Sequence, residues 1–344
     1  MHDHGTRKGE NTMNPELTRK LELLASNKIA IDKAFFLEMG ISQVIGGLLF
    51  ASAGKEVDIE RLKESKKILS KRKGIFSAFR DVAELVITSR MTLEADPEQY
   101  LSDLEAVFDV LMKGKVMEDS YMVITAMIIV DRGRKADAEE IRDKTNEIMR
   151  RMSKEHPLLT SSEDLALASL LAMSGRDIDT IIEEMEECYK YIKKELKIKA
   201  DSNSVQALSE ILALTGGSMK TKCDKVAELF NAFKEQGSKF GTYLEFPALG
   251  TLINIDVPAE DLAGEIIEAA DFLKKNKGFG GLSMDRKTRL MFAALLVGEV
   301  YTEENTDENV VNKAVITNNA LALAIAEEVA IMVVMMCVMT SNNN

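Results

Sequence analysis

Two kinds of segment alternate along this chain of 344 residues. The first kind is a run of apolar and small side chains, and the second is an amphipathic segment that starts acidic and ends basic. The apolar runs cover residues 41–53, 82–89, 122–130, 165–173, 205–214, 244–252 and 290–300. Each run predicts a helix buried on most of its sides, because small Ala and Ser side chains let neighbouring backbones approach.

The amphipathic segments are evenly spaced along the chain. Their intervals are 38 to 41 residues, and they begin near Asp58, Asp96, Asp137, Asp177, Ser218 and Pro258. Solenoids built from two-helix units repeat at about 34 to 47 residues. The spacing therefore predicts an all-α fold: a right-handed stack of about seven helix hairpins with antiparallel neighbours. Such an α-solenoid, or α–α superhelix, has a period of about 40 residues.

The segment 177–196 shows why such helices need neighbours. Its apolar residues follow steps of three and four and form one helical stripe: Ile178, Ile181, Ile182, Met185, Cys188, Tyr189, Ile192 and Leu196. A single helix pair cannot bury such a stripe, so the pairs must stack. No Gly/Ser-rich or Pro-rich linker divides the chain, so residues 15–309 are predicted to form one helical-repeat domain after a disordered leader, 1–14.

Composition excludes several functions. The net charge of −12 makes bulk binding to nucleic acid unfavourable. The basic run 61–73 carries seven Lys or Arg, and we interpret it as a solvated helix face, with RNA or an anionic lipid surface as the alternative. The absence of Trp argues against a sugar site. Three cysteines without metal-ligand spacing favour a reducing, cytoplasmic location and predict neither a metal site nor a cofactor.

Several segments resemble an uncharacterised bacterial family, described as a domain of unknown function. The matching segments are 54–61 (GKEVDIER), 165–172 (LALASLLA), 246–250 (FPALG), 278–283 (GFGGLS) and 288–296 (TRLMFAALL). The resemblance covers roughly residues 13–301. It implies a helical fold, and it implies no reaction, cofactor or catalytic residue.

Three glycine-bearing connections follow amphipathic helices: Lys73-Gly-Ile-Phe, Lys239-Phe-Gly and Lys277-Gly-Phe-Gly-Gly. Their shared position in the repeat predicts that they lie on one edge of the array. We interpret them as glycine C-caps followed by a packed Phe side chain, with a binding edge as the alternative. The candidates for that edge are Phe76, Arg80, Phe240, Tyr243, Glu245, Phe279, Arg286 and Arg289.

Two functions remain open from the sequence. The first is a non-catalytic scaffold that binds a protein or peptide. The second is a helical-toroid hydrolase with Glu245, Arg289, Asp164 and Glu118 on its loop edge. An open arc favours the scaffold, and a closed ring with converging carboxylates favours the hydrolase. His156 is the single histidine between residues 15 and 309, and we interpret it as a helix C-cap.

The C-terminal segment 320–339 is long enough to cross a bilayer. Its eight Leu, Ile and Val residues favour insertion by about 2.5 to 5 kcal/mol, whereas Glu327 and Glu328 oppose it by about 5 to 7 kcal/mol. Residues 310–340 are therefore predicted to form no membrane anchor but an apolar helix that packs on the array or on a second copy, with 341–344 frayed. Four methionines suit such an adaptable contact.

Overall fold

The protein is described here by a computed structural model that covers residues 13–38, 40–72, 77–79, 82–115, 117–214, 217–281 and 283–308. All elements of these residues are α-helices or short 3₁₀ helices, and no strand occurs among them. The predicted all-α class is confirmed. The predicted leader and the predicted C-terminal helix lie almost entirely outside the described residues.

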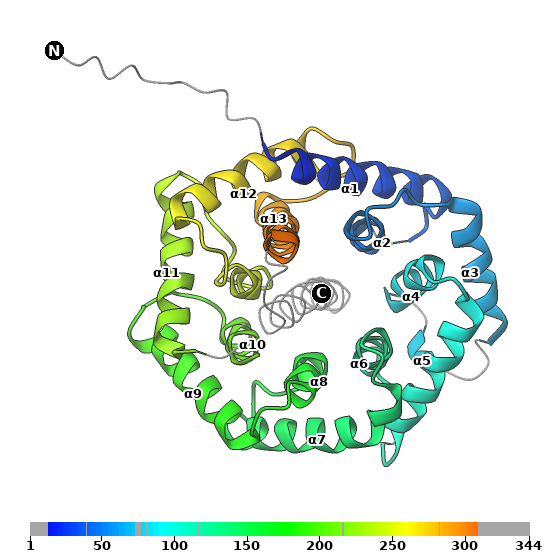
Figure 1. The fold of residues 1–344 in the computed structure, drawn as a ribbon, viewed down its shortest axis with the longest axis horizontal. Coiled ribbons are helices and arrows are strands. Elements are labelled where there is room, and N and C mark those ends of the chain that lie inside the picture. Colours follow the sequence, from blue (N-terminus) through cyan, green and yellow to red (C-terminus); the bar gives the residue numbers. More distant parts are fainter. Residues whose placement is uncertain are drawn as a thin grey trace.

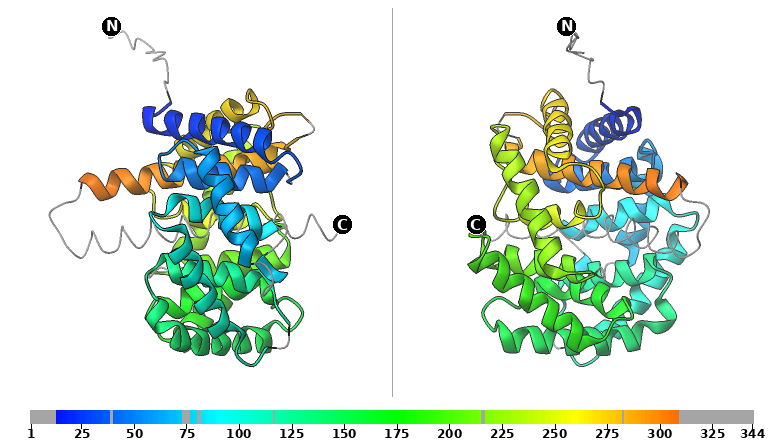
Figure 2. Two further views of the ribbon diagram at one scale, coloured as in Figure 1. Left: turned by 90° about the vertical axis from the view of Figure 1, so that its right-hand side faces the viewer. Right: turned by 60° about the vertical axis from the view of Figure 1, so that its left-hand side comes forward.

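The helices form two concentric rings (Figure 1). The outer ring consists of α1 (Pro15–Ala34), α3 (Ile59–Arg72), α5 (Pro97–Met112), α7 (Ala138–Glu155), α9 (Ile178–Lys194), α11 (Met219–Glu235) and α12 (Ala259–Lys274). The inner ring consists of α2 (Gly40–Ser52), α4 (Val82–Leu93), α6 (Ser120–Asp131), α8 (Leu165–Met173), α10 (Ser202–Ala213), the 3₁₀ helix η4 (Phe246–Thr251) and α13 (Arg286–Glu308). Helix α13 extends beyond its neighbours at one side of the molecule (Figure 2).

The sequence pattern explains the division into two rings. Inner helix α8 has every residue from Leu165 to Ala172 buried, as its uninterrupted apolar run requires. Outer helix α9 buries one stripe, and its other faces carry the charges. Side chains of both rings join into a large hydrophobic core that extends from Leu17 to Val300, and a second small cluster contains Ile31, Phe50, Leu62 and Leu85.

The predicted starts of the amphipathic helices are confirmed. Each of the six helices begins one residue after the predicted position, and three of those positions provide side-chain caps: Asp96, Asp177 and Ser218. Asp58 likewise accepts hydrogen bonds from the Glu60 and Arg61 backbone N–H groups. These caps satisfy backbone donors that a helix leaves free in its first turn.

One inner element differs from its prediction. The run 244–252 forms the 3₁₀ helix η4 and not an α-helix. Pro247 has no N–H group to donate. Gly250 packs so closely on α10 that a Cβ atom there would lie 2.7 Å from Ile211 Cγ2 and 2.9 Å from Leu208 Cδ1. A short and narrow element therefore fits this position.

Two cysteines that lie far apart in the sequence meet in the outer ring. Cys188 of α9 and Cys223 of α11 are both fully buried, and their Sγ atoms are 3.1 Å apart. The hydrogen bond with Cys188, together with burial, raises the pKa of the Cys223 thiol. Because the thiolate is the reactive form, the Cys223 thiol is poorly reactive in the folded protein, and burial shields both sulfur atoms from reagents.

We expect iodoacetamide to alkylate Cys188 and Cys223 far more slowly in the native protein than in urea. Peptide mapping by mass spectrometry reads the two sites separately, and the urea-unfolded sample is the control. If Cys223 reacted at the rate of a free cysteine without denaturant, the buried pairing would be wrong.

Candidate ligand-binding cavity at the ring closure

The ring closes where helix α1 meets α12 and α13. The Lys20 ammonium group on α1 forms an ion pair with Glu299 on α13, and a second with Glu303 Oε1 at 2.9 Å. Ser52 Oγ donates a hydrogen bond to Glu299 Oε2 at 2.8 Å. Burial by itself lowers the pKa of Lys20, but the two carboxylates outweigh burial and raise it. A charged, buried cluster therefore joins the two ends of the described chain.

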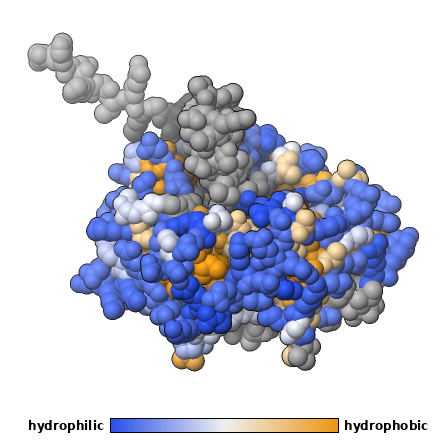
Figure 3. All heavy atoms as spheres, turned by 60° about the horizontal axis from the view of Figure 1, so that its bottom comes forward, coloured by the Kyte–Doolittle hydropathy of each residue, from blue (hydrophilic) through white to orange (hydrophobic). Residues whose placement is uncertain are grey.

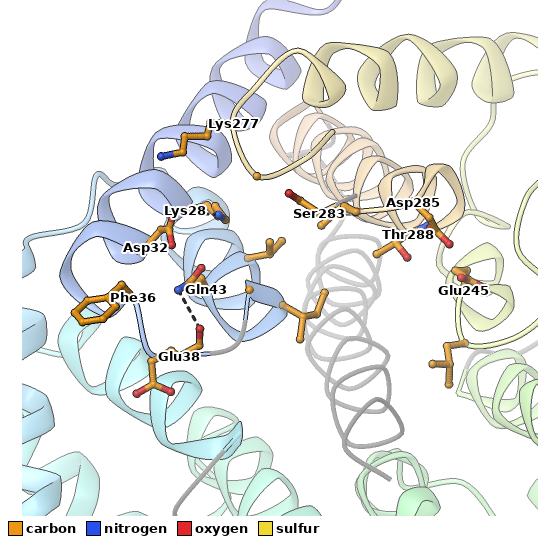
Figure 4. Close-up of a pocket in the computed structure, with 16 residues that line it drawn as sticks. Lys28, Asp32, Phe36, Glu38, Gln43, Glu245, Lys277, Ser283, Asp285 and Thr288 are labelled. Atoms are coloured by element: carbon orange, nitrogen blue, oxygen red, sulfur yellow. Dashed lines mark hydrogen bonds and ion pairs between the residues drawn. The ribbon is translucent and has the colours of Figure 1, made fainter. Parts of the chain in front are cut away.

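A cavity of about 690 Å³ lies beside this closure (Figure 4). Its volume falls within the range of about 300 to 1,000 Å³ that is typical of ligand sites. One side comes from α1, the α1–α2 connection, the start of α2 and the neighbouring Lys277 and Gly278, and the other side comes from Leu244, Glu245 and residues 283–288. The lining residues are Lys28, Asp32, Phe36, Glu38, Gly40, Ile41, Gln43, Val44, Leu244, Glu245, Lys277, Gly278, Ser283, Met284, Asp285 and Thr288.

Charges of opposite sign face each other across this cavity. Lys28 and Lys277 lie on the side of α1, whereas Glu245 and Asp285 lie on the opposite side (Figure 4). Asp285 Oδ1 accepts a hydrogen bond from the Thr288 backbone N–H at 2.8 Å and so caps α13. Glu245 lines the cavity, although its Oε2 is packed against Gly241, where a Cβ atom would lie 2.1 Å from it, and has no hydrogen-bond partner. The cavity therefore has a basic pole and an acidic pole.

Two side chains on the α1 side already have partners. Glu38 Oε1 accepts a hydrogen bond from Lys66 Nζ at 2.6 Å. Gln43 Nε2 donates to the backbone oxygens of Phe35 and Glu38, at 3.1 and 3.2 Å. These bonds fix the α1–α2 connection, from which Phe36 projects with 74% of its surface exposed.

Arg289 holds the connection between α12 and α13. Its Nη1 atom donates hydrogen bonds to the backbone oxygens of Phe279 and Met284, at 2.9 and 2.5 Å. Arg289 is 5% exposed, Phe279 is fully buried, and neither lines the cavity. Arg289 and Phe279 therefore stabilise the chain segment that forms part of the cavity wall, but they do not line the cavity themselves.

The other candidates for the binding edge have different positions. Phe240 is buried against Phe233, with ring centroids 4.9 Å apart, whereas Tyr243 is 52% exposed beside the cavity-lining Leu244. Arg286 donates a hydrogen bond to Ser238 Oγ and forms an ion pair with Asp271, each at 3.2 Å. Phe76 and Arg80 lie outside the described residues. Of the six candidates that the structure describes, Glu245 is the one that lines the cavity.

The remaining hydrolase candidates lie away from this cavity. Glu118 Oε2 accepts a hydrogen bond from the Ala78 backbone N–H at 3.1 Å and so joins two connections. Asp164 lies at the start of α8, where it closes a capping box with Ser161 and accepts a hydrogen bond from Gln206 Nε2 at 3.1 Å. The four hydrolase candidates therefore do not line one cavity.

Asp164 also faces Glu210 of α10, a carboxyl group that the sequence reasoning missed. Glu210 is fully buried, and Asp164 is 7% exposed. Burial, and then the nearby Asp164 carboxylate, raise the pKa of Glu210 well above its usual value. Burial likewise raises the pKa of Asp164. The two groups form a buried carboxyl pair, in which the raised pKa of Glu210 favours its protonated form.

His156 lies at the C-terminus of a helix, as the C-cap interpretation expects, and the described part of the basic run 61–73 lies on α3. His156 caps the C-terminus of α7, stacks on Tyr189 and lies 2.6 Å from Glu186 through Nε2. In the basic run, Lys63 pairs with Glu60 at 2.7 Å, and Arg72 pairs with Glu105 at 2.8 Å. This face of α3 therefore carries mixed charge.

Two further findings concern the described residues alone. They contain no group of three or more His, Cys, Asp or Glu side chains placed to hold a metal ion. None of their helices is both long and apolar enough to cross a membrane. The predictions for residues 310–340, including self-association and the absence of an anchor, fall outside this part of the chain.

These observations define an all-α protein whose outer and inner helices close into a ring, with a charged cavity at the closure. The chain belongs to the family described as "Protein of unknown function (DUF4003)", which matches residues 30–334. The family resemblance seen in the sequence is thereby confirmed. No curated protein and no solved structure matches the chain.

Proposed function

We propose that this protein is a non-catalytic helical-repeat scaffold, built as a ring of about seven stacked helix hairpins, that binds a protein or peptide partner. The observation that carries the proposal is the cavity of about 690 Å³ at the ring closure. It is large enough for a chain segment of several residues and combines apolar with charged lining side chains. A cytoplasmic location is part of the proposal, since the two described cysteines are free thiols.

Exposed apolar side chains support binding at the same rim of the ring. The five large hydrophobic residues that are exposed in the described chain are Phe36, Leu37, Met117, Leu158 and Tyr243. All five lie in connections that lead from an outer to an inner element. Large exposed apolar groups are typical of contact surfaces. Figure 3 shows hydrophobic residues as separate spots in a mainly hydrophilic surface, which suits a segment held at a few anchor points.

A peptide selection tests this function. A soluble library of short random peptides, with free carboxyl and with amidated C-termini, is incubated with the full chain, and the bound peptides are identified by mass spectrometry. We expect enriched sequences whose affinity falls about tenfold in Phe36→Ser, because the exposed ring at the mouth of the cavity is an anchor. Leu158→Ser is the matched control, since Leu158 is 95% exposed on the same rim but away from the cavity.

Two results would contradict the proposal. One is a library from which no peptide is enriched. The other is a set of peptides that bind Phe36→Ser and Leu158→Ser equally well.

The hydrolase is the second candidate, and the contact of α1 with α12 and α13 favours it, because a closed ring can bring acids of distant segments together. Glu245 and Asp285 line one cavity and would be its acid and base. Asp285 is engaged as the cap of α13 and three of the four expected residues lie elsewhere, so the scaffold is favoured. Hydrolysis of a peptide or glycoside substrate that is lost in Glu245→Gln would reverse this order.

A further inference from the structure

Lys28 places a buried ammonium group in the wall of the cavity. Its side chain is 7% exposed, and its one ion pair in the described chain is with Asp32, at 3.5 Å from Nζ to Oδ2. Charge-assisted hydrogen bonds are shorter, at about 2.7 to 2.9 Å, and an ammonium group carries three donors. None of the hydrogen bonds within the described residues uses Lys28 Nζ. The ammonium group therefore keeps donor capacity for a ligand.

At Gly278, the connection between α12 and α13 passes close to this ammonium group. A Cβ atom at Gly278 would lie 2.3 Å from Lys28 Nζ, and its φ of +89° is one that side chains other than glycine rarely adopt. The neighbouring Lys277 is exposed and also lines the cavity. Two lysines from opposite ends of the described chain therefore lie on the same side of the cavity.

The acids that line the cavity decide what kind of ligand fits. Four carboxylates line it, against two lysines: Asp32, Glu38, Glu245 and Asp285. Asp32 forms an ion pair with Lys28, and Glu38 forms an ion pair with Lys66. Glu245 lies on the other side of the cavity, where its Oε2 is buried against Gly241 and the rest of its carboxylate faces the ligand. A purely anionic ligand would meet this excess of acids, whereas a ligand with both charges would satisfy both poles.

We propose, on the basis of the proposed peptide-binding function, that the cavity takes the C-terminal end of a peptide chain. The terminal carboxylate is bound by Lys28 and Lys277, and a basic side chain upstream is bound by Glu245 and Asp285. Phe36, at the mouth, contacts the residues that leave the cavity. The charge pattern favours this end over an internal segment, because an internal segment carries no carboxylate for Lys28 unless it contains an acidic side chain.

The test compares enriched peptides as free acids and as C-terminal amides, by fluorescence anisotropy. We expect the free acids to bind about tenfold more tightly than the amides, because a charged hydrogen bond with Lys28 is lost in the amide. In Lys28→Met, which keeps the apolar stem, the preference for the free acid should fall most of the way toward equal binding, because only Lys277 then remains to bind the carboxylate. In Glu245→Gln, the preference for an Arg or Lys upstream should fall several-fold.

A second variant keeps the test independent of folding. Lys277 is exposed, so Lys277→Met should leave thermal unfolding unchanged and still reduce the ratio of acid to amide affinity. Lys63→Met, on the outer helix α3, is the control and should leave that ratio unchanged. Peptides that bind wild type equally as acids and amides would overturn the carboxylate site and leave peptide binding intact. A library without any enriched peptide would instead overturn the proposed function.

Discussion

Replacing Lys20 by methionine is expected to lower the free energy of unfolding by about 3 to 5 kcal/mol, because it leaves the buried Glu299 carboxylate without its counter-ion. The Lys20 side chain is 1% exposed and that of Glu299 is 6% exposed, so water cannot replace the lost partner without opening the ring closure. Urea unfolding followed by circular dichroism measures the change.

Two further variants separate the charge from the volume of the side chain. Lys63→Met removes a cation whose side chain is 50% exposed and should change stability by less than about 1 kcal/mol. The double variant Lys20→Met with Glu299→Met removes both charges and should recover most of the loss, since apolar replacement of a whole buried pair is often neutral. If Lys20→Met were as stable as Lys63→Met, the cluster would not hold the ring closed.

Replacing Glu210 by glutamine is expected to raise the free energy of unfolding near pH 8 by about 1 to 3 kcal/mol, because the neutral amide does not carry the cost of a buried carboxyl group above its unfolded pKa. The reason lies in the carboxyl pair with Asp164. Burial and the Asp164 carboxylate raise the pKa of Glu210 in the folded state, whereas the unfolded chain keeps an ordinary value. The folded state thus binds more protons, and the stability that the pair contributes below the unfolded pKa is lost as the pH rises through the folded pKa.

Urea unfolding measured from about pH 5 to pH 8 tests whether the stability contributed by the pair falls as the pH rises. Wild type should lose stability over this range relative to Glu210→Gln, whose amide does not titrate. Glu187→Gln, which removes an exposed carboxylate from α9, is the control and should follow wild type. Parallel pH profiles for wild type and Glu210→Gln would show that the pKa of Glu210 is not raised in the folded state.

Much of the helical pattern could be predicted because it is local. Asp96, Asp177 and Ser218 are residues whose side chains accept backbone hydrogen bonds, so the helices after them begin where the sequence indicates. The apolar run 165–173 coincides with α8. The prediction of an α-helix over 244–252 was wrong, because Pro247 and the contact of Gly250 with α10 act against an α-helix. The contact with α10 is not local and cannot be read from this segment.

The cavity was predicted only in part, because it depends on ring closure. Closure results from small rotations added over all the helix pairs, which no single segment encodes. Glu245 was identified from its position beside an apolar run. Lys28 was missed although it carries a signal: it interrupts the buried stripe of α1 between Leu24 and Ile31. Glu210 carries the same signal within the run 205–214.

The closure of the ring also fixes its circumference. An open array of helix pairs can gain or lose one pair at either end, because every interface that remains is unchanged. In a closed ring, one pair more or less, about 40 residues, would move Lys20 out of register with Glu299. We therefore expect length variation within this family to fall in the connections and at the chain ends, with the number of helix pairs unchanged.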